Sequence, residues 1–275
     1  MTPGRRSSVA RHVDAYLTPR RPDDPPRPVD NPGLELTRGL KVIAQPAARE
    51  ELHKRISSLA TPSVDYVRAY NRWTEMVDDL PGTVQQRAFR VQGRMIVGYG
   101  AESVLEASIA LNQPWGMPYI PGTALKGLAA HYLQGVLANG DANFRRVPDL
   151  DPATNMPPNL NAHGVLFGTQ RDAAYITWHD AWLVPENTNP HPLCLDVITT
   201  HHPGYYQERG HKEPTDFDDP TPISFLSARG TYLICLQGPS DEWVNLAYTV
   251  LTEALAHAGI GAKTAAGYGR MTPTA

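Results

Sequence analysis

The chain has 275 residues, a net charge of −3 with histidine counted as neutral, and only two cysteines. This length is enough for one large domain or two small ones, and Cys194 and Cys235 lie too far apart for a CxxC zinc site, so we expect two buried free thiols. The near-neutral charge excludes a strongly basic, free-standing nucleic-acid-binding protein, and any such contact must come from a local patch. No apolar run approaches the roughly 20 residues of a membrane-spanning helix, and the N-terminus lacks the apolar segment of a secretory signal, so we expect a cytoplasmic protein without a membrane partner.

Two segments precede the predicted core. Residues 1–35 are dense in proline and arginine, which predicts a flexible arm whose arginines either contact RNA or a neighbouring protein or stay solvated. Residues 36–85 predict a helical extension, because apolar residues recur at helical spacing and Ser63 can cap a second helix that ends at Pro81-Gly82. The side chains expected to face inward are Leu52, Ile56 and Leu59 in the first helix and Val67, Tyr70, Trp73 and Val77 in the second.

Residues 86–275 form the predicted core, in which strand and helix patterns alternate. The expected strands cover residues 88–97, 105–111, 164–167, 174–184, 193–198, 223–226 and 231–237, with Phe89 and Val91 on the buried face of the first and a hairpin turn at 227–230. The expected helices cover 123–137, with Leu125, Leu128, Tyr132, Leu133 and Val136 inward, and 240–257, with Ser240 as N-cap and Gly259 at the end. This order predicts an α+β fold, a ferredoxin-like sandwich with long loops at 138–162 and 199–222.

The start of the first core helix carries an anion-binding pattern. Gly122 and Thr123 open the helix and Lys126 lies in its first turn, where a cation opposes the helix dipole at a cost of about 0.3–1 kcal/mol. A phosphate at this end would reverse that cost and accept hydrogen bonds from free N–H groups. The alternative is a lysine on a solvated helix face. The spacing departs from GxxxxGK[ST], which excludes a nucleotide P-loop.

The chain closes on a glycine-rich loop that begins at Gly259. Glycines let backbone N–H groups approach a phosphate closely, a lysine and an arginine add charge, and a tyrosine adds a stacking face. The candidate RNA-binding residues of this loop are Gly261, Lys263, Gly267, Tyr268, Gly269 and Arg270. The alternative is a tight turn in which the glycines only supply positive φ. In a ferredoxin-like sandwich, this loop and the first helix's start lie at the same end and can hold consecutive phosphates.

A histidine-rich stretch follows the strand expected at 193–198. Asp196, His201 and His202 are competent metal ligands, but they lack the close spacing of a metal site, so we expect neither metal nor cofactor. The segment is interpreted as a loop that contacts RNA, with His202 among the RNA-binding residues, or a neighbouring protein. Tyr205 and Tyr206 either stack on bases or pack against the sheet. No catalytic acid and base pair stands out, and no catalytic residue is predicted.

The motifs resemble a known family. Residues 118–133 and 259–270 are similar to the helix start and the glycine-rich loop of the RAMP superfamily of CRISPR-associated RNA-binding proteins. The segments 100–106, 115–121, 196–202, 205–206 and 222–226 resemble the sixth subunits of Cmr (type III-B) effector complexes, in the same order along the chain.

This resemblance implies an RRM-like RAMP fold with large insertions, and a non-catalytic subunit that caps the 3′ end of crRNA and supports target RNA recognition in antiviral defence. The implied partners are crRNA, target RNA, neighbouring RAMP backbone subunits and the small subunit of the Cmr complex. Two alternatives stay open: an endoribonuclease on the same fold that processes guide or cleaves target RNA, and a related subunit of a type III-A complex.

Overall fold

The central sheet explains how the candidate residues come together. The computed structural model describes residues 29, 31–39, 46–101, 107–146, 161–186, 191–200 and 221–274. Its main sheet has the order β2-β4-β7-β1-β8, with β3 also paired to β7, and every pairing is antiparallel. The strands are β1 (Thr83–Val91), β2 (Tyr119–Ile120), β3 (Thr177–Trp178), β4 (Ala181–Leu183), β7 (Thr231–Gly238) and β8 (Met271–Pro273).

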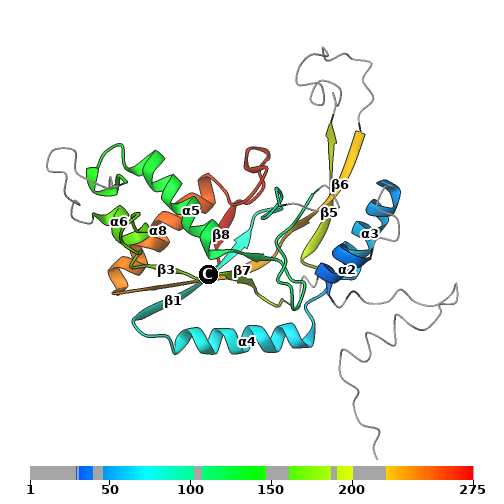
Figure 1. Ribbon diagram of the computed structural model, residues 1–275, viewed down its shortest axis with the longest axis horizontal. Coiled ribbons are helices and arrows are strands. Elements are labelled where there is room, and N and C mark those ends of the chain that lie inside the picture. Colours follow the sequence, from blue (N-terminus) through cyan, green and yellow to red (C-terminus); the bar gives the residue numbers. More distant parts are fainter. Residues whose placement is uncertain are drawn as a thin grey trace, which may run out of the picture.

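Helices cover both faces of this sheet (Figure 1). On one side lie α5 (Gly122–Tyr132), α6 (Ala162–Phe167) and α8 (Asp241–His257), and on the other lies α4 (Val64–Asp78). Along the chain, β1, α5, β4, β7, α8 and β8 give the order strand, helix, two strands, helix, strand, with β1 between β7 and β8. This confirms the predicted ferredoxin-like α+β fold.

The first core strand follows its predicted pattern. Phe89 and Val91 are buried and Arg90 is exposed, because side chains alternate across a strand. The strand starts earlier than expected, at Thr83, where it pairs with Gly238. Beyond Val91 the chain continues as isolated bridges, including Met95 with Ala228.

The helix α4 is fixed by an aromatic cluster. Its cap, Ser63, accepts a hydrogen bond from the Tyr66 N–H at 3.1 Å, as predicted. The buried Tyr66 hydroxyl donates to the Leu183 carbonyl at 2.6 Å, although the sequence pattern did not place this tyrosine inward. Trp182 on β4 stacks on both Tyr66 and Trp73, with centroid distances of 5.9 and 5.3 Å. Aromatic stacking and one buried hydrogen bond therefore hold α4 against the sheet.

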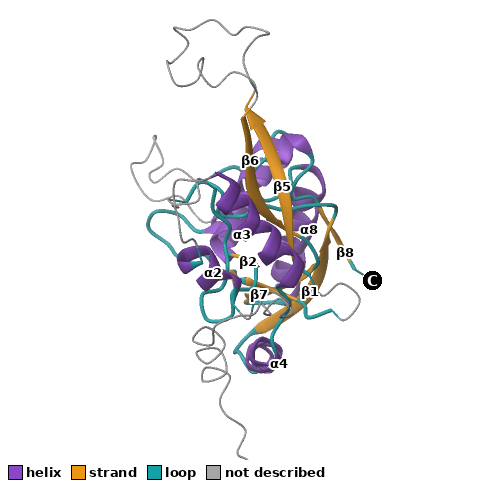
Figure 2. Ribbon diagram, turned by 90° about the vertical axis from the view of Figure 1, so that its right-hand side faces the viewer, coloured by secondary structure: helices purple, strands orange, loops and turns teal. Residues whose placement is uncertain are grey.

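A second layer stands beside the sandwich. The strands β5 (Leu193–Thr200) and β6 (Thr221–Ala228) form a two-stranded ribbon, and α2 (Pro32–Arg38) and α3 (Pro46–Leu59) lie along it (Figure 2). The apolar residues buried between them are Val29, Leu52, Ile56, Ala60, Leu193 and Leu226. Residues 32–35, assigned from sequence to the flexible arm, thus belong to a helix. The earlier part of that arm, residues 1–28, lies outside the described residues.

Several predicted elements are wrong. Residues 227–230 do not close a hairpin, because β6 pairs with β5 whereas β7 pairs with β1 and β4. The expected strand 164–167 is the helix α6, whose Asn161 cap accepts from the Gly164 N–H; a short apolar run cannot distinguish the two. The strand expected at 174–184 is divided into β3 and β4. Of the strand expected at 105–111, the described part contributes one bridge, from Leu111 to Pro118.

The ends of two helices also differ from expectation. The helix from Gly122 ends in a π-helical turn, Leu133–Leu137, and its wider winding leaves Val136 53% exposed rather than inward. Ser240 precedes α8, but its side chain makes no capping hydrogen bond to a backbone N–H of the first turn. Its hydroxyl bonds instead to Glu242, which lowers the pKa of this carboxyl. Gly259 ends α8 as expected, with φ of 77° and its N–H donating to Ala254 at 3.0 Å.

The free thiols agree with the sequence: Cys194 and Cys235 are both buried and unpaired. Among the described helices, none has the length and apolar composition needed to span a membrane.

The stability of the α3–ribbon layer is expected to depend on pH through His53. Burial, and next the charge of Arg49, lower the pKa of His53 from 6.5 to about 4, and its Nδ1 lies 3.0 Å from the Ser224 hydroxyl. Because the unfolded state binds this proton more readily, stability is full above pH 6.5 and falls by up to about 3 kcal/mol as pH drops toward 4. Urea unfolding at pH 7 and 4.5 measures the loss. The loss should be smaller in His53→Gln, and equal losses in both proteins would contradict the assignment.

Candidate nucleic-acid interface

The glycine-rich loop packs its two ends against the strand region 94–96. Gly261 and Gly269 both have positive φ, 88° and 75°. A Cβ at Gly261 would lie well under 3.0 Å from the Ile96 carbonyl oxygen, and one at Gly269 equally close to the Ile260 carbonyl. Two backbone hydrogen bonds fix the loop there. The Ala262 N–H donates to the Ile96 carbonyl at 2.7 Å, and the Gly269 N–H donates to the Arg94 carbonyl at 2.8 Å. These two glycines supply positive φ, as in the turn alternative that the sequence left open. They are also required by close packing, which the sequence did not indicate.

The tip of the loop is different. Gly267 also has positive φ, 89°, but a Cβ there would meet no atom within 4 Å. It follows a short 3-10 turn, Thr264–Ala266, and is exposed. The bare backbone at Gly267 is thus open to an approaching ligand.

Lys263 introduces this tip in a strained conformation. Its φ of 58° is the only positive value at a non-glycine residue in the described part of the chain. Its ammonium lies 5.3 Å from the Tyr99 ring centroid and 5.8 Å from that of Phe225, within reach of cation–π attraction. No carboxylate of the described residues pairs with it. The positive charge of Lys263 is therefore held in place but not neutralised.

Tyr268 has a hydrogen-bonding role in the structure. Its hydroxyl donates to Asp196 Oδ2 on β5 at 3.2 Å. Burial, and next the Asp196 charge, raise the pKa of Tyr268, so the phenol stays protonated and remains a donor. The buried Ser227 hydroxyl donates to the same oxygen, and Arg94 Nε lies 3.7 Å from it. Asp196 thus joins the glycine-rich loop to the ribbon, and no group of metal-ligating side chains occurs among the described residues.

Arg270 and the start of α5 are engaged by the protein itself. The Arg270 guanidinium donates to the Ala256 carbonyl in the last turn of α8, at 3.5 Å. At the start of α5, the Gly122 N–H donates to Asp180 Oδ1 at 2.8 Å, so a protein carboxylate already occupies part of this N-terminus. A Cβ at Gly122 would collide with the Trp178 carbonyl, which explains the glycine.

Thr123 and Lys126 remain accessible on α5. Thr123 is exposed and Lys126 is half-buried, and neither side chain makes a hydrogen bond or ion pair with a described residue. Figure 1 shows α8 running toward the glycine-rich loop and α5 starting beneath it, on the same side of the sheet. No hydrogen bond or ion pair of the described residues joins Lys126 to this loop.

Known proteins share this arrangement. The RAMP superfamily profile matches residues 88–272, from β1 through the glycine-rich loop to β8. A chain from Pyrococcus furiosus named CRISPR system Cmr subunit Cmr6 is 30% identical over 247 residues, which cover 75% of this chain and 72% of that protein. The chain belongs to the RAMP superfamily, in the Cmr6 family.

Two solved structures also match the chain. A chain of the type III-B Cmr-beta complex bound to cognate target RNA, determined by cryo-EM, matches with a TM-score of 0.63 and 17% identity, covering 86% of this chain and 77% of that one. This match supports the fold. The crystal structure of Cmr6 from Pyrococcus furiosus matches with 31% identity and a TM-score of 0.45, covering 71% of this chain and all of the other.

The sequence did not indicate the residues that anchor the glycine-rich loop. The residues Arg94, Tyr99, Phe225 and Ser227 were not singled out from the sequence as site residues. Their contacts with the loop depend on the ribbon folding back on the sandwich, which no local pattern reveals. The predicted RNA-binding His202, like His201, Tyr205 and Tyr206, lies outside the described residues.

Proposed function

We propose that this chain is a non-catalytic, RNA-binding structural subunit of a type III-B CRISPR effector complex, in which it caps the 3′ end of crRNA and supports recognition of target RNA. Its partners in this role are crRNA, target RNA, the neighbouring RAMP backbone subunits and the small subunit of the complex. Membership of the Cmr6 family supports the assignment, and so does the fold shared with a chain of an RNA-bound Cmr complex.

The observation that carries the RNA contact is the tip of the glycine-rich loop. Lys263 presents a cation that no described carboxylate neutralises, and Gly267 beside it leaves the backbone bare. A phosphate can approach both at once, since no Cβ at Gly267 stands in its way. The N–H groups of residues 266–268 already donate to carbonyls within the loop, so the attraction comes from the Lys263 charge. On α5, Lys126 and Thr123 add a second unpaired cation and an exposed hydroxyl, which extend the contact along the RNA backbone.

The salt dependence of crRNA binding tests this proposal. In the reconstituted complex, Lys126→Ala with Lys263→Ala removes two phosphate contacts. The slope of log K against log salt should therefore become shallower by about 1.4, because each phosphate contact on a single strand contributes roughly 0.7. A double variant with the same change in charge on α3 and α4, Lys54→Ala with Arg68→Ala, should keep the wild-type slope.

Two outcomes would contradict the proposal. An unchanged slope in the Lys126 and Lys263 double variant would show that neither lysine contacts a phosphate. Cleavage of bound RNA that is lost on replacing one histidine, while binding persists, would favour the endoribonuclease instead.

A further inference from the structure

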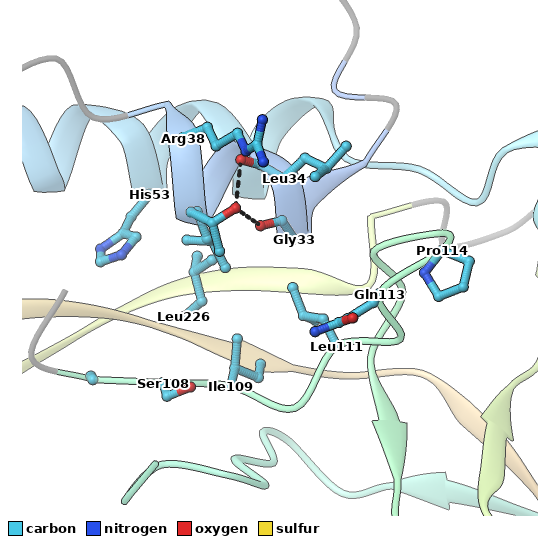
Figure 3. Close-up of a pocket in the computed structure, with 13 residues that line it drawn as sticks. Gly33, Leu34, Arg38, His53, Ser108, Ile109, Leu111, Gln113, Pro114 and Leu226 are labelled. Atoms are coloured by element: carbon cyan, nitrogen blue, oxygen red, sulfur yellow. Dashed lines mark hydrogen bonds between the residues drawn. The ribbon is translucent and has the colours of Figure 1, made fainter. Parts of the chain in front are cut away.

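A cleft of about 1050 Å³ lies between α2 and the segment 107–114, and none of the predicted RNA-binding residues lines it (Figure 3). Ile109 and Leu111, together with Leu226 from β6, form its apolar floor. Across the cleft, α2 contributes Leu34, which is 47% exposed, and Arg38. A concave site with apolar walls and few polar groups is typical of ligand binding.

The cleft is preformed by the cap of α2. The Asn31 side chain accepts from the Leu34 N–H at 3.1 Å, and it donates to the Gln113 and Pro114 carbonyls at 2.9 and 3.2 Å. One side chain therefore holds both walls at a fixed separation.

The segment 107–111 has one free edge. On its paired side, Ser108 and Ala110 donate backbone hydrogen bonds to Tyr99 and Val97, at 3.5 and 2.7 Å. The N–H and C=O groups of Ile109 and Leu111 alternate to the other side, and in the described part of the chain they make no hydrogen bond. Unpaired strand edges accept an added strand, which supplies partners for these groups.

The charge of the cleft distinguishes between ligand classes. Among the described residues that line the cleft, Arg38 is the only one charged at neutral pH, since burial keeps the pKa of His53 at about 4. Arg38 forms no ion pair with a described residue. A nucleic acid brings a phosphate with every nucleotide and needs several cations, whereas the described walls contribute only Arg38. A single guanidinium above an apolar floor fits one carboxylate on an otherwise apolar chain.

We propose that this cleft binds an extended peptide segment of a partner protein. The peptide adds as a strand to the free edge at Ile109 and Leu111, places alternate apolar side chains between α2 and the floor, and pairs an acidic side chain with Arg38. This docking surface is separate from the proposed RNA contact, and the two are tested by different variants.

Selection from a phage-displayed library of random octapeptides on the full-length protein tests the docking surface. Enriched peptides should alternate apolar residues and carry an acidic one. Their affinity should fall at least tenfold on Leu34→Glu or Arg38→Glu. It should be unchanged by Val64→Glu, a matched control at a 69% exposed position on α4. Methylating the peptide amide that pairs with the free edge should weaken binding equally.

Each other outcome overturns the proposal. If no peptides are enriched, the cleft is not a peptide-binding site. The same conclusion follows if enriched peptides bind the Leu34→Glu and Arg38→Glu variants as tightly as the wild type. A synthetic peptide of residues 1–28 that binds the cleft and displaces the selected peptides would make the chain's own arm the occupant. Oligouridine binding that is lost in Arg38→Glu would make the cleft an RNA site.

Discussion

Replacing Gly269 with alanine is expected to destabilise the protein by more than about 3 kcal/mol, whereas the same change at Gly267 costs about 1 kcal/mol. Both residues have positive φ, so both variants carry the left-handed backbone penalty. Only at Gly269 does the new Cβ collide with backbone atoms, those of Ile260, which are tied to Gly269 by a hydrogen bond of 2.9 Å. Because these atoms cannot move separately, the loop must open.

Urea unfolding of the two variants measures the difference directly. Gly267→Ala keeps the fold, so its RNA affinity reports on the loop tip alone, and we expect binding about tenfold weaker because the Cβ blocks close approach of a phosphate. Equal stability of the two variants would contradict the packing argument. Wild-type RNA affinity in Gly267→Ala would show that RNA does not approach the backbone there.

The sandwich could be predicted from the sequence because its signals are local. The alternation of Phe89 and Val91 with exposed residues depends only on strand geometry, and the Ser63 cap and the Gly259 terminus depend only on a few neighbouring residues. The motifs of the two segments predicted to bind RNA, 118–133 and 259–270, add family membership, which the family profile and the Cmr6 relative confirm.

The errors arise where distant segments decide the structure. After β6 ends at Ala228, the chain enters the main sheet as β7, and no local pattern at 227–230 indicates this choice of partner strand. The carboxylate of Asp180 reaches the start of α5 from the turn between β3 and β4, so an N-terminus that looks free in the sequence is partly occupied. For the same reason, glycines that look alike in the sequence have different roles in the structure. Gly261 is required by close packing, whereas a Cβ at Gly267 would meet no neighbouring atom.

The hydroxyl of Tyr268 is expected to matter more for RNA binding than its ring. Tyr268→Phe keeps a stacking surface but removes the hydrogen bond to Asp196 that ties the loop to the ribbon. A hydrogen bond to a charged group contributes about 1.5–3 kcal/mol, and this half-buried one is placed at the lower end, which corresponds to roughly tenfold weaker RNA binding. The control is Tyr175→Phe, at an exposed tyrosine whose hydroxyl makes no hydrogen bond with a described residue.

Hydrogen exchange over residues 262–269 separates the two roles of Tyr268. Faster exchange together with weaker binding in Tyr268→Phe would support anchoring through Asp196. If Tyr268→Phe binds RNA like the wild type while Tyr268→Ala does not, base stacking is the function of the ring and the anchoring account is wrong.

Removing the negative charge of Asp196 is expected to strengthen the electrostatic attraction for RNA, whereas Tyr268→Phe is expected to weaken RNA binding. Asp196→Asn keeps an acceptor for Ser227 and Tyr268 but removes the carboxylate that faces Arg94 at 3.7 Å. Arg94 then becomes available to a phosphate, and the salt dependence of RNA binding should steepen by about 0.7, the effect of one added contact. Asp196→Ala loses the acceptor as well, so it should loosen the loop and weaken binding. Opposite changes in the two variants would show that Asp196 orders the loop through hydrogen bonds while its charge limits the attraction for RNA. Equal changes in RNA binding would contradict this division into two separate effects.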